Sequence, residues 1–87
     1  MDPIRLTFVT PEGGRWERQV RSVNLVSEDG SLGILAGHAP MLCTVRPCVV
    51  RARFGEEGEL RVRVGEGFAW VENNGVTLLV AEAEEVN

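Results

Sequence analysis

At 87 residues the chain is long enough for one domain, and a domain of this size buries only about 60–65% of the surface that its unfolded form exposes. Hydrophobic residues make up 44% and charged residues 25% of the sequence, which is typical of a globular protein and argues against a disordered or fibrous chain. The net charge of −4 argues against a nucleic-acid partner, because phosphate binding depends on clustered cations. No apolar run approaches the roughly 20 residues of a membrane-spanning helix and no secretory signal is recognisable, so we expect a cytosolic protein.

Period-two alternation in short runs between glycine-rich turns predicts an all-β domain. In the first run, Ile4, Leu6 and Phe8 share one parity, and residues 10–14 supply the proline and glycines of a turn. In the next run the apolar parity switches between Val20 and Val23. A single regular strand would expose half of these residues, so the sequence predicts a bulge or break near residues 21–22.

The middle of the chain is predicted to form a turn, a short strand and a loop. Residues 28–31 are typical of a turn, residues 32–35 of a very short strand, and residues 37–40 of an irregular loop before an extended run over 41–45. Two cysteines, Cys43 and Cys48, are too few for a disulfide framework. Five residues apart on one expected strand, they would point to opposite faces, and we expect free thiols.

A hairpin is predicted after residue 47, because apolar residues alternate with arginines on both sides of a glycine-rich loop at residues 55–58. Pairing the apolar faces places Arg53 opposite Arg61 and Arg51 opposite Arg63, so that four arginines share one face. We expect nearby glutamates to offset their repulsion, with Glu12, Glu17 and Glu59 as candidates. The alternative is that the arginines form a docking patch for an acidic surface.

The last third of the chain predicts one more hairpin and a tail. Asn74 and Gly75 both tolerate positive φ and are expected to form a type I′ turn, followed by a return strand over residues 76–81. The acidic tail, residues 83–87, is expected to fray from a domain spanning residues 1–82. The predicted fold is a small two-sheet antiparallel sandwich or flattened barrel of about ten short strands. Its predicted buried residues are Phe8, Val23, Leu25, Val50, Leu60, Val62 and Leu78.

The order of short motifs points to one known family. The motifs are Thr10-Pro-Glu-Gly13, Ser27-Glu-Asp-Gly30, Leu32-Gly-Ile-Leu35, Gly37-His-Ala-Pro40, Gly67-Phe68 and Asn74-Gly-Val-Thr77. At this spacing, and over nearly the whole chain, the sequence resembles the N-terminal β-sandwich domain of the epsilon subunit of F-type ATP synthases.

The resemblance implies a non-catalytic rotor subunit without cofactor or metal, which links the gamma subunit to the c-ring and couples ion translocation to ATP synthesis. It implies a peripheral position at the cytoplasmic face of the bacterial inner membrane. The implied c-ring contact is Glu28, Asp29, Gly30, Ser31 and Leu32, and the implied gamma contact is His38, Ala39, Pro40 and Met41. The family's C-terminal helical hairpin has no counterpart in these residues, so neither its inhibition of ATP hydrolysis nor its ATP binding is expected here.

Less specific interpretations remain open for the same residues. His38 lacks a neighbouring carboxylate pair or second histidine in the sequence, which favours a structural or contact role over catalysis or metal binding. Glu28 and Asp29 are also ordinary turn residues. Trp16, Phe68 and Trp70 are expected in the core. A free-standing β-sandwich interaction module is the alternative function, and an enzyme is disfavoured because no catalytic group of residues is recognisable.

Overall fold

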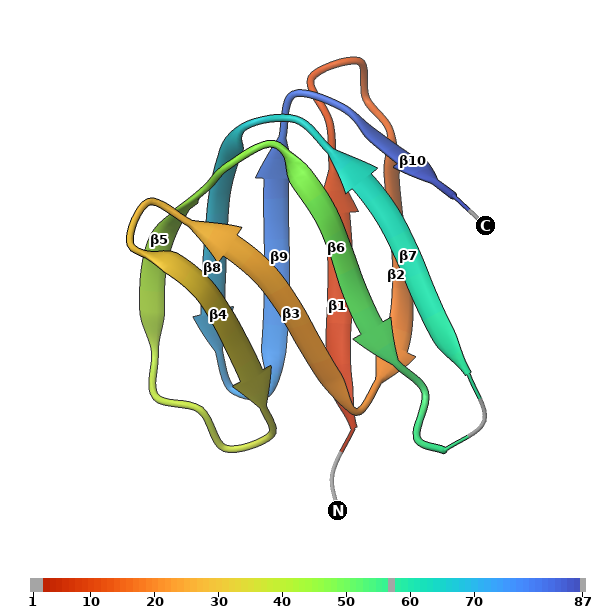
Figure 1. Ribbon diagram of the computed structural model, residues 1–87, viewed down its shortest axis with the longest axis vertical. Coiled ribbons are helices and arrows are strands. Elements are labelled where there is room, and N and C mark those ends of the chain that lie inside the picture. The colour runs from red at the N-terminus through yellow and green to blue at the C-terminus, as the bar shows by residue number, and fades with distance from the viewer. Residues whose placement is uncertain (1–2, 57, 87) are drawn as a thin grey trace.

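The computed structural model describes residues 3–56 and 58–86, and these residues form ten strands and no helix. The strands make two five-stranded sheets that face each other in two layers (Figure 1). The first sheet has the order β2-β1-β9-β8-β5 and the second has the order β10-β7-β6-β3-β4. The predicted all-β sandwich is confirmed. The strands are β1 (Ile4–Val9), β2 (Arg15–Val20), β3 (Ser22–Ser27), β4 (Gly30–Leu35), β5 (Met41–Val45), β6 (Cys48–Arg53), β7 (Glu59–Val64), β8 (Gly67–Glu72), β9 (Gly75–Val80) and β10 (Ala83–Glu85).

Strand pairing is antiparallel except between β1 and β9, which run parallel at the centre of the first sheet. The two strands lie far apart in the sequence, so this pairing was not visible in the local pattern. It places the start of the chain against its last long strand. The middle of the first sheet is therefore formed by two strands from opposite ends of the sequence.

The core lies between the sheets and is built from the inward parity of each strand. Ile4, Leu6 and Phe8 of β1 are all fully buried, as their alternation predicted. All seven residues predicted to be buried are at most 4% exposed: Phe8, Val23, Leu25, Val50, Leu60, Val62 and Leu78.

The predicted break near residues 21–22 is confirmed, and it marks a change of sheet. Val20 ends β2 in the first sheet, and Val23 lies in β3 of the second sheet. Both side chains are buried. Because the chain crosses between layers at Arg21, the inward direction changes parity there, which is why the apolar residues switch from one parity to the other.

The register of the β6–β7 hairpin differs from the predicted one by two residues. Arg51 lies opposite Arg61, while Arg53 lies opposite Glu59 and Arg63 lies opposite Val49. The loop begins one residue earlier than expected: the backbone N–H of Phe54 donates to the carbonyl of Gly58 at 3.0 Å, and Leu60 pairs with Ala52. Only one pair of arginines is directly opposed, and Glu59 enters the arginine-bearing face.

The turn between β8 and β9 consists of Asn73 and Asn74, one residue earlier than predicted, and Gly75 begins β9. Their φ angles of 52° and 60° are the positive values that a type I′ turn requires. The tail that was expected to fray instead contributes β10, which pairs with β7. That expectation was wrong because the edge of β7 offers backbone groups that an extended tail can satisfy.

Candidate docking site

The turn between β3 and β4 and the start of β4 carry the five residues expected to contact the c-ring: Glu28 and Asp29 form the turn, and Gly30, Ser31 and Leu32 belong to β4, which begins two residues earlier than predicted. The Ser27 hydroxyl donates to the carbonyl of Gly30 at 3.1 Å and accepts from the N–H of Asp29 at 3.3 Å. The N–H of Glu28 donates to Oγ1 of Thr44 at 3.2 Å, which ties the turn to β5 of the other sheet. Glu28, Asp29 and Ser31 are exposed, Gly30 is half-buried at φ 116°, and Leu32 packs against the core. The turn is therefore a fixed, exposed tip bearing two carboxylates.

The loop between β4 and β5 carries the residues expected to contact gamma. The N–H of His38 donates to the carbonyl of Leu35 at 3.2 Å, and Nδ1 of its ring lies 2.7 Å from the carbonyl of Ala39. A proton on Nδ1 makes that contact a hydrogen bond, which holds the ring against its own loop. Ala39 and Pro40 are exposed, while Met41 is half-buried and packs against the core.

A side chain from a distant hairpin holds this loop. The N–H of Gly37 donates to Oδ1 of Asn74 at 2.7 Å, and the N–H of Arg5 donates to the Asn74 carbonyl at 2.9 Å. Asn74 therefore joins three segments: the β4–β5 loop, the β8–β9 turn and the start of β1. Sequence reasoning assigned Asn74 to a turn and missed this second role, since no local pattern marks a contact across 37 residues.

The two expected contacts lie at opposite ends of β4, with the β3–β4 turn near the top left and the β4–β5 loop at the bottom left of Figure 1. The six extended residues of β4 separate Asp29 from the loop that carries His38, which corresponds to roughly 20 Å. The structure does not bring the two segments together. They would contact different surfaces of an assembly.

Four large apolar side chains project into solvent from the outer face of the first sheet. Their exposed fractions are 63% for Leu42, 52% for Phe68, 51% for Trp70 and 44% for Leu79. Leu42 lies opposite Trp70 and Phe68 lies opposite Leu79, so the four belong to neighbouring positions on β5, β8 and β9. We call these four residues the apolar patch. Groups of this kind mark docking surfaces more often than single exposed apolar residues do.

The apolar patch corrects one prediction. Phe68 and Trp70 were expected in the core, but Ala69 and Val71 take the inward parity of β8 and are at most 2% exposed. The strand can bury only one parity, so both aromatic side chains face outward. Trp16, the third aromatic, is half-buried and stacks on Phe8 with a centroid distance of 4.4 Å.

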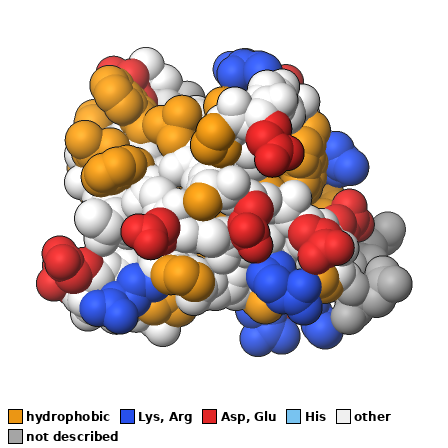
Figure 2. Space-filling model, turned by 90° about the horizontal axis from the view of Figure 1, so that it is seen from above, with side chains coloured by type: hydrophobic (Ala, Val, Ile, Leu, Met, Phe, Trp, Pro, Cys, Tyr) orange, Lys and Arg blue, Asp and Glu red, His pale blue; other side chains and the backbone are white. Residues whose placement is uncertain are grey.

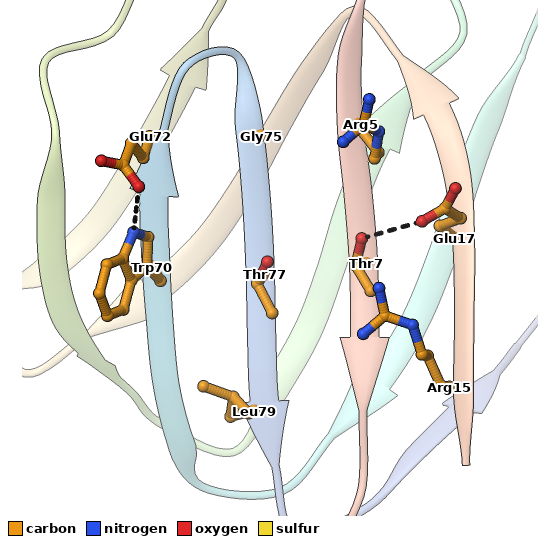
Figure 3. A pocket seen from close by; sticks show the side chains of 9 residues that line it. All are labelled: Arg5, Thr7, Arg15, Glu17, Trp70, Glu72, Gly75, Thr77 and Leu79. Carbon is orange, nitrogen blue, oxygen red and sulfur yellow. Dashed lines mark hydrogen bonds between the residues drawn. The ribbon is translucent and has the colours of Figure 1, made fainter.

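The apolar patch adjoins both the β4–β5 loop and a shallow hollow. A depression of about 300 Å³ is lined by Pro40, Met41, Leu42, Trp70, Val71 and Glu72, so it joins the loop to the patch. A second hollow, of about 500 Å³, lies over β1 and β9, with Thr77 between the Trp70 side and the Arg15 side (Figure 3). In this hollow Nε1 of Trp70 donates to Glu72 at 3.3 Å. The loop, the patch and the hollows form one continuous surface.

The end view shows where apolar and basic side chains gather. Figure 2 shows most hydrophobic side chains at the upper left and several basic side chains at the lower right, with further basic side chains at the top and the lower left. Apolar and cationic side chains favour different partners, since the first bind by burial and the second by charge. The molecule therefore presents surfaces of different chemistry on different sides.

The described residues contain no group of three or more histidine, cysteine or acidic side chains that could hold a metal ion. Both cysteines are free, as expected, but they lie in different sheets, on β5 and β6, and not along one strand. Burial raises the pKa of the Cys43 thiol, which keeps it protonated and weakly nucleophilic. Residues 3–56 and 58–86 include no helix long and apolar enough to cross a membrane.

The family assignment follows from comparison with known proteins. Residues 3–86 match the family model of the ATP synthase Delta/Epsilon chain β-sandwich domain. The chain belongs to this family. The ATP synthase epsilon chain of the cyanobacterium Cyanothece sp. is 45% identical over 81 residues, which cover 93% of this chain and 58% of that protein. The chloroplastic epsilon chain of Cyanidioschyzon merolae is 40% identical over 84 residues, covering 97% and 63%. The chain thus spans about three-fifths of the length of these relatives.

Two solved structures share the fold. A chain of the Euglena gracilis mitochondrial ATP synthase, from a cryo-EM structure that includes the c-ring, superposes with a TM-score of 0.85 at 22% identity. That match covers 98% of this chain and 54% of the other. A chain from the Tetrahymena thermophila ATP synthase central stalk and c-ring gives a TM-score of 0.71 at 17% identity, covering 92% and 64%. These likenesses establish the sandwich architecture.

Proposed function

We propose that this domain is a non-catalytic central-stalk subunit of an F-type ATP synthase, which links gamma to the c-ring and so couples ion translocation to ATP synthesis. The observation that carries the proposal is the apolar patch beside the β4–β5 loop, in a domain whose relatives are epsilon chains. A rotor joint needs surface complementarity and no chemistry of its own. The free-standing interaction module remains the competing function, and it would use the same patch for another partner.

Gamma is assigned to the apolar patch together with His38, Ala39, Pro40 and Met41. These residues form one surface, and its exposed apolar area suits a permanent interface, which resembles a protein core more than ordinary surface does. The half-buried Met41 contributes mainly by supporting the loop, whereas its neighbour Leu42 is available for contact.

The c-ring is assigned to the β3–β4 turn and the start of β4, residues Glu28, Asp29, Gly30, Ser31 and Leu32. The turn lies at the other end of β4 from the gamma-contact loop, as a joint between two partners requires. Its hydrogen bonds to Ser27 and Thr44 hold the tip in one conformation, which lowers the entropy cost of docking. Within the complex the domain would be peripheral to the membrane, on the cytoplasmic face of the bacterial inner membrane or its counterpart in a photosynthetic organelle.

The proposal is tested by titrating the domain with the gamma subunit of the same organism. Replacing Leu42 and Phe68 together by serine should weaken binding at least about tenfold, because exposed apolar anchors dominate such interfaces. The control replaces Val49 and Phe54, exposed at 40% and 43% outside the patch, by serine. Equal loss in both double variants, or none in the first, would contradict the assignment of gamma to the patch.

A separate experiment tests the turn. Glu28→Gln and Asp29→Asn together should leave gamma binding unchanged and reduce association of the gamma-bound domain with isolated c-ring. The change conserves shape and removes only charge, so the circular dichroism spectrum should not alter. Unchanged c-ring association in this variant would show that the two carboxylates make no contact there.

A further inference from the structure

The outer face of the second sheet carries four exposed arginines on two adjacent strands. Arg51 and Arg53 project from β6, and Arg61 and Arg63 project from β7, with side chains between 47% and 58% exposed. We call these residues the arginine face. It lies on the opposite side of the sandwich from the apolar patch, because the two sets project outward from different sheets.

One carboxylate holds three of these arginines. Oε1 of Glu59 lies 2.9 Å from Nε of Arg61 and 3.4 Å from Nε of Arg51, and Oε2 lies 3.9 Å from Nη1 of Arg53. Hydrogen bonding from Arg61 is the main cause that lowers the pKa of Glu59, so the carboxylate is charged at neutral pH. A single negative charge cannot neutralise three guanidinium groups. The cluster therefore retains unmatched donors and positive charge.

The fourth arginine pairs with the tail. Nη1 of Arg63 donates to Oε1 of Glu84 at 3.1 Å, where β10 adds to the edge of β7. Four guanidinium groups thus meet two carboxylates on a face of a chain whose net charge is −4. This face is therefore locally positive although the whole molecule is negatively charged. A local charge of this kind directs an oppositely charged partner to one part of the surface.

We propose that the arginine face docks an acidic polypeptide segment of a partner protein, independently of the apolar patch. Arg51 lies opposite Arg61, while Arg53 lies two residues further along β6 and Arg63 two residues further along β7, so the four arginines project from a diagonal row across the two strands. Cross-strand neighbours lie about 5 Å apart and alternate residues along a strand about 7 Å apart. Carboxylates on alternate residues of an extended chain have the same repeat. The pairing of Glu84 in β10 with Arg63 in β7 is an example of that arrangement within the molecule itself.

A diagonal row of arginines across two strands suits a polypeptide better than it suits the other anionic partners. A single phosphate is bound most strongly where guanidinium groups converge, and here the point of convergence is already occupied by Glu59. An anionic bilayer also attracts local clusters of basic residues, but its charged plane would approach the exposed carboxylate of Glu84 as closely as it approaches the arginines, whereas a peptide can place its carboxylates beside the guanidinium groups alone.

The probe is a synthetic peptide of alternating glutamate and serine, titrated into the isotope-labelled chain and followed by backbone chemical shifts. The shifts should concentrate on β6 and β7 and weaken as salt is raised. Arg51→Gln with Arg61→Gln should reduce affinity about tenfold. Glu59→Gln should increase affinity, because it releases three arginines from their internal partner.

The matched control is Arg5→Gln with Arg15→Gln, which removes the same charge from the outer face of the first sheet, where neither arginine makes an ion pair within the described residues. Its affinity should stay within about twofold of the parent. If peptide affinity fell equally in both double variants, net charge alone would explain the effect, and the proposal would be overturned. Absence of peptide binding at low salt would also overturn it, as would tighter binding of inorganic phosphate or phosphatidylglycerol vesicles. None of these outcomes bears on gamma binding through the apolar patch.

Discussion

At the scale of single residues, the tightest steric constraint lies at Gly67, where β8 begins. A Cβ atom there would overlap the carbonyl oxygen of Leu79 and lie 2.7 Å from the Cα of Val80. Both atoms belong to the backbone of β9 and cannot rotate away. We expect Gly67→Ala to lower the free energy of unfolding by about 1–3 kcal/mol, measured by urea denaturation.

Gly33 offers a matched comparison, since it also lies in a strand. A Cβ at Gly33 would lie 3.1 Å from Oδ1 of Asn24, a side-chain atom that can move. Gly33→Ala should therefore cost much less than Gly67→Ala. Similar losses in the two variants would mean that backbone overlap does not explain the glycine at position 67.

Glu59 makes stability depend on pH. Its folded-state pKa is lowered from the ordinary value of 4.5, chiefly by the hydrogen bond from Arg61. The contribution of Glu59 is therefore present above about pH 4.5 and is lost as the pH falls through the lowered pKa. The melting temperature of the parent should exceed that of Glu59→Gln at neutral pH, and the difference should shrink in acid. A difference independent of pH would contradict this origin.

The burial of individual residues was predicted correctly where it was inferred from alternation along a strand. The prediction was wrong for Phe68 and Trp70, where residue type was given more weight than alternation. Leu78 was correctly predicted to be buried. In any antiparallel pairing of β8 with β9 that has a two-residue turn, an inward Leu78 places Ala69 and Val71 on the inner face. The outward direction of Phe68 and Trp70 was therefore already contained in the sequence, but the general preference of aromatic residues for the core pointed the other way.

At the scale of elements, the side chain of Asn74 holds the β4–β5 loop through its hydrogen bond from Gly37. Asn74→Gly retains the positive φ of the turn and removes the 2.7 Å bond to the N–H of Gly37. We expect amide hydrogen exchange to increase at residues 36–40 and gamma binding to weaken, with little change in the hairpin itself.

Asn73 provides the matched control for this prediction. It occupies the other position of the same turn, at φ 52°, and its side chain has no hydrogen bond among those described. Asn73→Gly should leave exchange in the loop unchanged. If both variants loosen residues 36–40 equally, the turn backbone and not the Asn74 side chain holds the loop.

The positions of single strands and turns were more predictable than the pairing between strands. The ranges of β1 and β5 and the break at Arg21 follow from local alternation, whereas the β3–β4 turn was predicted at the right place but two residues too long, since β4 begins at Gly30. The β6–β7 register depended on the loop bond between Phe54 and Gly58, and β10 depended on the free edge of β7. Both are consequences of backbone hydrogen bonding between segments, which side-chain periodicity does not report.

At the scale of the whole molecule, the first sheet carries apolar side chains on its inner face and on part of its outer face, and the two sets have different purposes. The inner face completes the core, and the outer face carries the apolar patch on β5, β8 and β9. The two sequence segments expected to dock are both exposed, but the patch between them was missed. Its residues come from two distant parts of the chain and become neighbours only through the β5–β8 pairing.

Two adjacent leucines on β9, one on each face of the first sheet, allow the roles of the two faces to be tested separately. Leu78 is fully buried and Leu79 is 44% exposed in the apolar patch. Leu78→Ala should lower the free energy of unfolding by about 2–5 kcal/mol, because it leaves a cavity between the sheets. Leu79→Ala should change it by no more than about 0.5 kcal/mol, because its side chain already contacts water.

The effects of the two variants on gamma binding should be the reverse of their effects on stability. At a temperature where both variants are folded, Leu79→Ala should weaken association with gamma, since it removes part of the exposed apolar surface. Leu78→Ala should bind gamma like the parent, because its side chain faces the second sheet. Chemical denaturation and titration calorimetry on the same two proteins measure both quantities. A Leu79→Ala variant that unfolds as easily as Leu78→Ala would contradict the assigned strand parity, and one with undiminished gamma affinity would exclude Leu79 from the interface.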